Sequence, residues 1–108
     1  MFVFRTAWIV KPGCMAQART MLDRALNENI RHPFPVAVTC RVLWSDAAPD
    51  TLVFEEGWPD AQTHDAWWEA DNKTPENKAF FEEWNKLVAR MVPTEVWQEA
   101  EWKYAAPL

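Results

Sequence analysis

The chain has 108 residues, a formal net charge of −5 and a hydrophobic share of 49%. This length fits one domain, residues 1–108, and the hydrophobic share excludes a disordered chain. Lys and Arg are scattered without a basic run, so we expect no nucleic-acid partner, because phosphate binding needs clustered positive charge.

The N-terminal part of the chain has a strand pattern followed by a helix pattern. Apolar residues alternate along residues 2–11, which predicts a strand, and Pro12 and Gly13 end it. Over residues 14–30 the apolar residues recur at helical spacing and form one stripe. This stripe predicts a helix that packs against the strand.

A β-hairpin is expected next. The proline-rich residues 32–35 cannot continue the helix, since each Pro lacks an N–H and forces the residue before it into an extended conformation. Residues 36–45 and 51–58 both alternate as strands, and the residues between them favour a turn.

The C-terminal part has a second helical region and a last strand. Residues 60–71 form one helical segment, and a new helix begins at Thr74-Pro75, with Thr as N-cap and Pro in the first turn. An apolar stripe over residues 80–91 predicts that this helix continues until Pro93 stops it. Residues 94–104 then alternate as a strand.

This order predicts an α+β domain of the ferredoxin-like β-α-β-β-α-β type, a four-stranded antiparallel sheet with the helices on one face. The uncovered face should then alternate between apolar and polar residues. Instead, strand 2–11 is mostly apolar on both faces, and Leu43 and Trp97 add to the uncovered side. Because such surface usually marks an interface, we predict a homodimer with two sheets packed face to face.

Three segments carry a resemblance to a known family: Val10-Lys11-Pro12-Gly13, Phe54-Glu55-Glu56-Gly57-Trp58-Pro59-Asp60 with the later Ala66-Trp67-Trp68, and residues 80–87 with the later Glu95-Val96-Trp97. Together they resemble the dimeric α/β-barrel superfamily, in particular its NIPSNAP-like and antibiotic-biosynthesis-monooxygenase-like branches, over nearly the whole chain. The resemblance implies a pocket between the sheet and the helices of each subunit. It implies activities from cofactor-free oxidation of aromatic polyketides or quinols to heme degradation.

The heme-degrading branch, by the same resemblance, uses an Asn on the first strand, a Trp on the second helix and a His further along that helix. Here Thr6 lies at about the Asn position and Trp67 at the Trp position. Both histidines, His32 and His64, precede Trp67. Heme ligation is therefore not carried over to this chain, and no cofactor is expected.

His64, Trp67 and Trp68 are spaced i, i+3 and i+4 on the helix predicted over residues 60–71, so they are neighbours in space. A histidine beside two indoles could transfer a proton in an apolar pocket near neutral pH, which makes His64 and Trp67 the candidate catalytic residues. The alternative is a partly exposed histidine beside core tryptophans. No convergent spacing of metal ligands is found, so we expect no metal.

A set of mostly aromatic residues is predicted to line the ligand pocket: Thr6, Trp8, Trp44, Trp58 and Trp68. Ligand pockets are mostly apolar with a few placed polar groups, which this set provides. The alternative is a core rich in Trp that packs without a cavity.

Glu55 and Glu56 follow each other on a predicted strand and therefore point to opposite faces. A buried carboxylate needs a partner, and Arg5 or Arg41 on neighbouring strands could supply it. The pair could either bind the polar end of a ligand or form a structural ion pair.

Two functions fit these features. The first is a homodimer that binds a small aromatic or hydrophobic molecule in each subunit, with the activity of a cofactor-independent monooxygenase; the second is a non-catalytic ligand-binding or interaction protein. The apolar runs are too short to span a membrane, and the N-terminus lacks a signal-peptide pattern. Cys14 and Cys40 are too few for a disulfide framework, so we expect a cytoplasmic protein.

Overall fold

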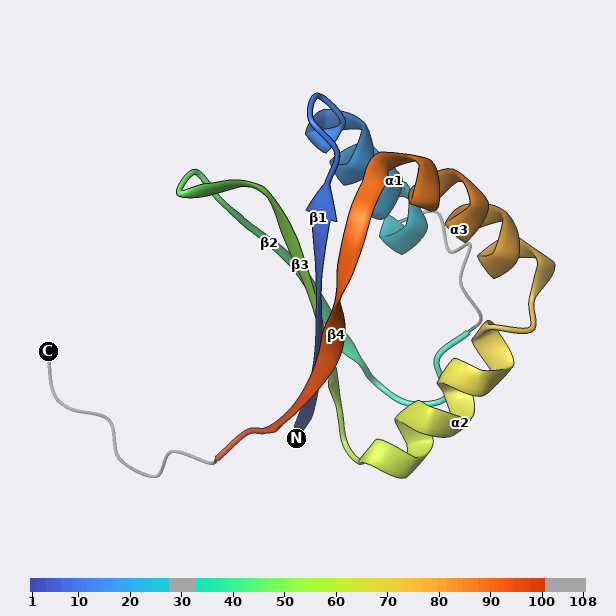
Figure 1. Cartoon of the computed structure of the whole chain (residues 1–108). Helices are drawn as coiled ribbons and strands as arrows, with labels where there is room; N and C mark the ends of the chain where they lie inside the picture. Colours follow the sequence, from blue (N-terminus) through green and yellow to red (C-terminus); the bar gives the residue numbers. More distant parts are fainter. Residues whose placement is uncertain (28–32, 101–108) are drawn as a thin grey trace, which may run out of the picture.

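The computed structural model describes residues 1–27 and 33–100. The strands are β1 (Phe2–Val10), β2 (Thr39–Ser45), β3 (Ala48–Trp58) and β4 (Val88–Gln98), and the helices are α1 (Met15–Asn27), α2 (Ala61–Asp71) and α3 (Pro75–Leu87). The strands pair antiparallel in the order β2-β3-β1-β4. All three of these helices lie on one side of the sheet, and its other side carries none of them (Figure 1). The predicted α+β, ferredoxin-like fold is confirmed.

Local sequence signals start both C-terminal helices. The carboxylate of Asp60 accepts a hydrogen bond from the backbone N–H of Thr63 at 2.7 Å and so caps α2. This backbone hydrogen bond lowers the pKa of Asp60 below its usual 3.8, because it stabilises the charged form. Thr74 caps α3 in the same way through Asn77, with Pro75 in the first turn. The predicted N-cap and Pro of this helix are confirmed.

The prediction that the last helix continues until Pro93 is wrong. Helix α3 ends at Leu87, and β4 begins at Val88 instead of residue 94. Pairing with β1 outweighs the helical stripe, since Val88 lies opposite Val10 in the sheet. Pro93 is tolerated because β4 is an edge strand whose register against β1 shifts near this position. Residues 101–104 of the predicted strand lie outside the described residues.

Other boundaries differ from the prediction by a few residues. Strand β2 begins at Thr39 rather than residue 36, and β3 begins at Ala48, so the hairpin turn is tighter than expected. Helix α1 ends at Asn27 in the described part, and residues 28–30 of the predicted helix lie outside it.

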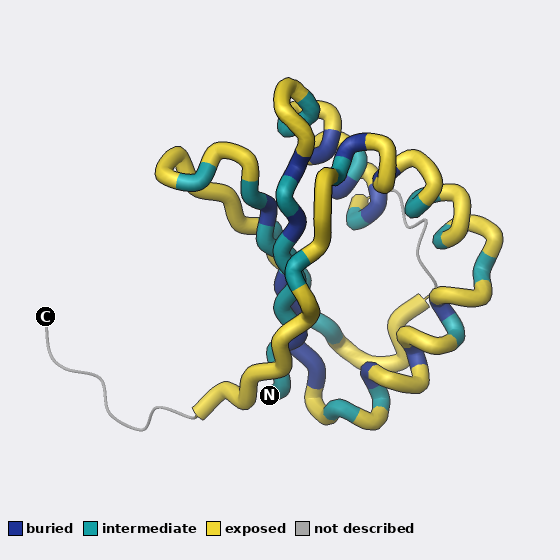
Figure 2. The backbone as a smooth tube through the Cα atoms, viewed as in Figure 1, coloured by how far each residue is buried: buried dark blue, intermediate teal, exposed yellow. Residues whose placement is uncertain are grey.

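The core between the sheet and the helices has two centres. The larger cluster joins β1 and β3 to α1 and α3 and contains Trp8, Val10, Ala18, Leu22, Leu52, Trp84 and Leu87. The smaller cluster joins β1 and β3 to α2 and contains Phe4, Trp58 and Trp67. Figure 2 shows the buried positions along the central strands and the inner sides of the helices. In the described part, no helix is long and apolar enough to cross a membrane.

Candidate functional site

A cavity of about 400 Å³ lies between the sheet and the helices. The sheet contributes Phe4, Thr6, Trp8, Phe54, Glu56, Met91, Thr94 and Val96 to its wall. The helices contribute Leu22, Ala25, Leu26, His64, Trp68, Glu76, Asn77, Phe80 and Phe81. The wall therefore combines many aromatic and aliphatic side chains with a few polar ones, as in sites for small organic ligands.

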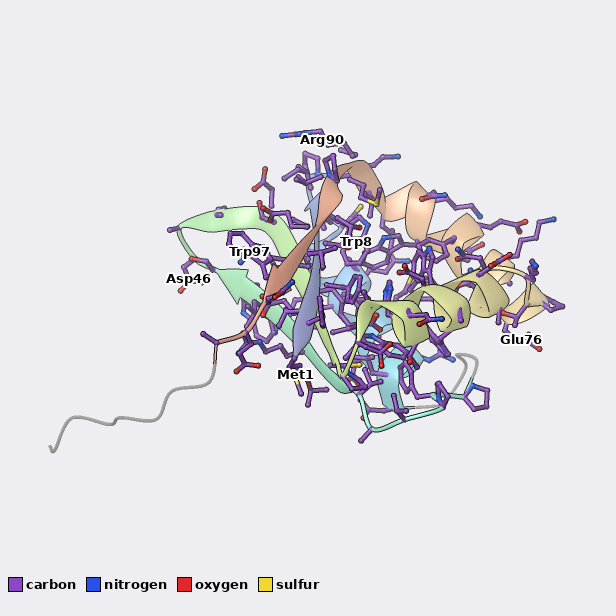
Figure 3. All side chains as sticks on the ribbon, turned by 90° about the horizontal axis from the view of Figure 1, so that it is seen from below. Met1, Trp8, Asp46, Glu76, Arg90 and Trp97 are labelled. Atoms are coloured by element: carbon purple, nitrogen blue, oxygen red, sulfur yellow. The ribbon has the colours of Figure 1, made fainter. Side chains whose placement is uncertain are left out.

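The sheet side of the cavity follows from the strand period. Phe4, Thr6 and Trp8 alternate along β1 and so share the face that looks toward the helices. The same period puts Phe54 and Glu56 of β3 on that face, with Phe54 paired opposite Thr6. Figure 3 shows Trp8 among the crowded side chains on the helix side of the sheet.

Three polar side chains of the sheet reach the wall. The hydroxyls of Thr6 and Thr94 lie 2.9 Å apart and join β1 to β4. Glu56 is 3% exposed, and it lies opposite Phe4 in the pairing of β1 with β3. These side chains can give or accept hydrogen bonds inside an otherwise apolar space, where such bonds fix a ligand's orientation.

His64 is the titratable group of the wall with the most aromatic surroundings. Its ring stacks on Phe4, with centroids 3.4 Å apart, and on Trp68 at 6.2 Å. Its Nδ1 lies 2.9 Å from Oδ1 of Asp65. Because an ionised carboxylate only accepts hydrogen bonds, Nδ1 is the donor in this contact, and Nε2 is the nitrogen that could exchange a proton with a ligand.

Four of the seven residues predicted for the site line the cavity: Thr6, Trp8, His64 and Trp68. Trp58, Trp67 and Trp44 are not among its lining residues. Trp58 and Trp67 pack together in the smaller core cluster, with ring centroids 5.4 Å apart. Trp44 is 53% exposed near the hairpin and carries the guanidinium of Arg19 over its ring at 3.8 Å. The roles in binding and catalysis stay predictions.

The helical period explains why adjacent tryptophans differ. His64 and Trp68 are four residues apart and share one side of α2, which borders the cavity. Trp67 is rotated about 100° from Trp68 around the helix axis, so it points into the core cluster. It is 3% exposed, whereas Trp68 is 41% exposed.

The sequence analysis raised Glu55 and Glu56 together as a possible ligand contact without choosing Glu56 for the wall, and it gave Phe80, Phe81 and Thr94 no role in the site. For Glu56 the signal was present, since it shares strand parity with Phe54 on β3. For Thr94 there was none, because its position depends on where β4 begins.

Glu55 points away from Glu56, to the bare face, which is the side of the sheet that carries none of the helices α1, α2 and α3. Its carboxylate accepts a hydrogen bond from Nε of Arg41 at 2.7 Å, and Nη1 of Arg5 lies 3.9 Å away. The prediction that Arg5 and Arg41 could supply its partner is confirmed. Within the described ranges, no group of three or more His, Cys, Asp or Glu side chains is arranged to hold a metal ion.

Comparison with known proteins connects this geometry to a fold. No family model and no curated protein matches the chain. Solved structures do match. A NIPSNAP family protein from Agrobacterium tumefaciens str. C58 is 11% identical with a TM-score of 0.77, covering 93% of each chain. A NIPSNAP-like domain protein from Burkholderia xenovorans is 16% identical with a TM-score of 0.77, covering 99% of this chain and 90% of that one.

An antibiotic biosynthesis monooxygenase also matches, at 15% identity and a TM-score of 0.69, covering 94% of this chain and all of that one. The chain shares its ferredoxin-like fold with these proteins. The predicted resemblance is confirmed at the level of this fold. Since one fold serves many functions, the activity has to be argued from the cavity.

Proposed function

We propose that the cavity binds a small aromatic or hydrophobic molecule in each subunit of a homodimer. The observation that carries this proposal is the cavity of about 400 Å³, which lies in the usual range for small-ligand sites. Well-packed cores leave few voids larger than a water molecule, so a space of this size is unusual for a merely structural interior. Aromatic walls favour a flat ligand through stacking and edge-to-face contacts.

The bare face of the sheet supports the homodimer. Val3, Ala7, Ile9 and Val53 lie on this face, and Leu43 is 39% exposed there. Trp97 is 56% exposed and points away from the helices (Figure 3). A second copy that packs on this face would remove the apolar surface from water.

A cofactor-independent monooxygenase is a more specific candidate. In this reaction an activated CH₂ of the ligand becomes C=O, one atom of O₂ enters the product and the other leaves as water with both hydrogens. His64 would take the first proton at Nε2 while Asp65 holds Nδ1. Trp67 does not line the cavity, and it would position Trp68, whose ring centroid lies 6.4 Å away. The matched antibiotic biosynthesis monooxygenase adds support.

Fluorescence titration tests binding, since Trp8 and Trp68 line the cavity. The probes are quinols, flavins, aromatic polyketides and heme, and at least one aromatic probe should change the emission with saturation. The variant Thr94→Phe, which puts a bulky ring into the cavity in place of a hydroxyl, should weaken the response. Thr20→Phe on the exposed side of α1 is the matched control and should keep it.

Oxygen consumption with each binder then decides between the two candidates. Uptake of O₂ that falls in His64→Phe while binding persists supports the monooxygenase. Saturable binding without oxygen uptake would leave the non-catalytic ligand-binding protein. If no probe binds, or if Thr94→Phe binds as well as the unchanged chain, the cavity proposal is wrong.

A further inference from the structure

The bare face of the sheet carries one row of charges that crosses all four strands. Arg41 on β2, Glu55 on β3, Arg5 on β1 and Glu95 on β4 are successive neighbours in the strand registers. Nη2 of Arg41 lies 2.7 Å from Glu55, and Arg5 lies 3.9 Å from both Glu55 and Glu95. The signs therefore alternate from one edge of the sheet to the other.

The rows on the two sides of this charged row differ from each other. On one side the registers align an entirely apolar row: Leu43, Val53, Ala7 and Val92. On the other side they align a mixed row: Thr39, Gly57, Val3 and Trp97. The face is thus asymmetric along the strand direction, so different ways of stacking two copies bring different rows together.

Two copies that pack through the same face are related by a two-fold axis parallel to both sheets. If this axis runs along the strands, between β1 and β3, each row lies over the same row in reversed order. Arg41 then faces the partner's Glu95, and Glu55 faces the partner's Arg5. The apolar row also meets the apolar row, so both charge and hydrophobicity match.

The other aligned arrangement has the axis along the charged row. Each charge then faces its own copy, so that Arg5 meets the partner's Arg5 and Glu55 meets the partner's Glu55. The apolar row also lies over the mixed row. An interface that brings like charges together is strongly disfavoured, and this arrangement would do so at every position of the row.

We propose that the charged row sets the orientation of the homodimer by selecting the arrangement whose two-fold axis runs along the strands. This inference rests on the homodimer proposed above. The row contributes specificity more than affinity, because ion pairs lose hydration when an interface covers them. The apolar row supplies the affinity, and the charges exclude the wrong stacking.

Charge reversal at the ends of the row tests the orientation. Arg41→Glu makes both ends negative, and Glu95→Arg makes both ends positive, so each variant should repel its own copy at two places. The side chains of Arg41 and Glu95 are 68% and 54% exposed, so both positions tolerate polar substitutions. Sedimentation should show self-association weakened by about tenfold or more for each variant at low salt.

An equimolar mixture of the two variants is the decisive sample. Each substituted end then faces an opposite charge, so the mixture should associate within about threefold of the unchanged chain. The reversals Glu69→Lys and Lys73→Glu provide the control. Glu69 lies on α2 and Lys73 two residues after its end, both away from the bare face, with side chains 74% exposed, and their reversal should leave association unchanged.

A second series avoids Arg41, whose substitution leaves Glu55 beside another carboxylate. This series counts the like-charge contacts between position 41 of one copy and position 95 of the other. There are none in the unchanged dimer, one in a dimer of one unchanged chain with one Glu95→Arg chain, and two in the Glu95→Arg homodimer. Affinity should fall in that order. An unchanged chain that stays monomeric at micromolar concentration overturns the homodimer itself. A dimer whose reversals have no effect, or do not recover on mixing, overturns only the orientation.

Discussion

Trp67 and Trp68 are adjacent in sequence, yet truncating them should have different consequences. A Trp side chain buries about 150–250 Å², and about 25 cal/mol per Å² gives roughly 5 kcal/mol for full burial at mid-range. Trp67 is 3% exposed and keeps nearly all of this value. Trp68 is 41% exposed, which reduces its value to about 3 kcal/mol. The two values differ by about 2 kcal/mol.

Thermal unfolding at one fixed protein concentration measures this difference. Trp67→Ala should melt roughly 10 °C below Trp68→Ala, since 1 kcal/mol shifts the Tm of a domain this size by about 4–8 °C. In ligand titrations the order reverses. Trp68→Ala should weaken the binding of an aromatic probe about tenfold, whereas the milder Trp67→Phe should change it little.

Trp44→Ala is the control for both assays, because Trp44 is exposed and outside the cavity wall. It should change neither the probe affinity nor, by more than a small amount, the Tm. Equal losses of Tm for the two neighbouring variants would refute the burial argument. A Trp68→Ala variant with unchanged probe affinity would refute its position in the binding site.

Two further predictions concern single local contacts. Because hydrogen bonding from Thr63 lowers the pKa of Asp60, its carboxylate stabilises the fold above pH 3.8 and loses this contribution as the pH falls through the lowered pKa. Acid titration followed by circular dichroism should therefore show a smaller drop in stability over this window for Asp60→Asn than for the unchanged chain. A Cβ on Gly57 would collide with Oγ1 of Thr39 and lie 2.7 Å from Sδ of Met1, so Gly57→Ala should destabilise the sheet. Thr39→Ala should recover part of that loss in the double variant, and additive losses in urea unfolding would contradict the contact.

The sequence determined what depends on near neighbours. Strand alternation placed Phe4, Thr6 and Trp8 on one face, and the Thr74-Pro75 pair marked the start of α3. The element order then restricted the fold to an antiparallel sheet with its helices on one side. The apolar residues on the face without helices could therefore also be recognised from the sequence. These features follow from backbone geometry over a few residues and can therefore be recognised in the sequence.

Only the tertiary structure decided the end of α3, the wall of the cavity and the charged row. The segment after Leu87 has a helical stripe, but pairing with β1, far away in sequence, satisfies its backbone and draws it into the sheet. Whether Trp67 or Trp68 borders the cavity depends on how α2 is rotated against the sheet. Whether a cavity exists at all depends on how closely three helices approach one face, and no local pattern encodes that distance.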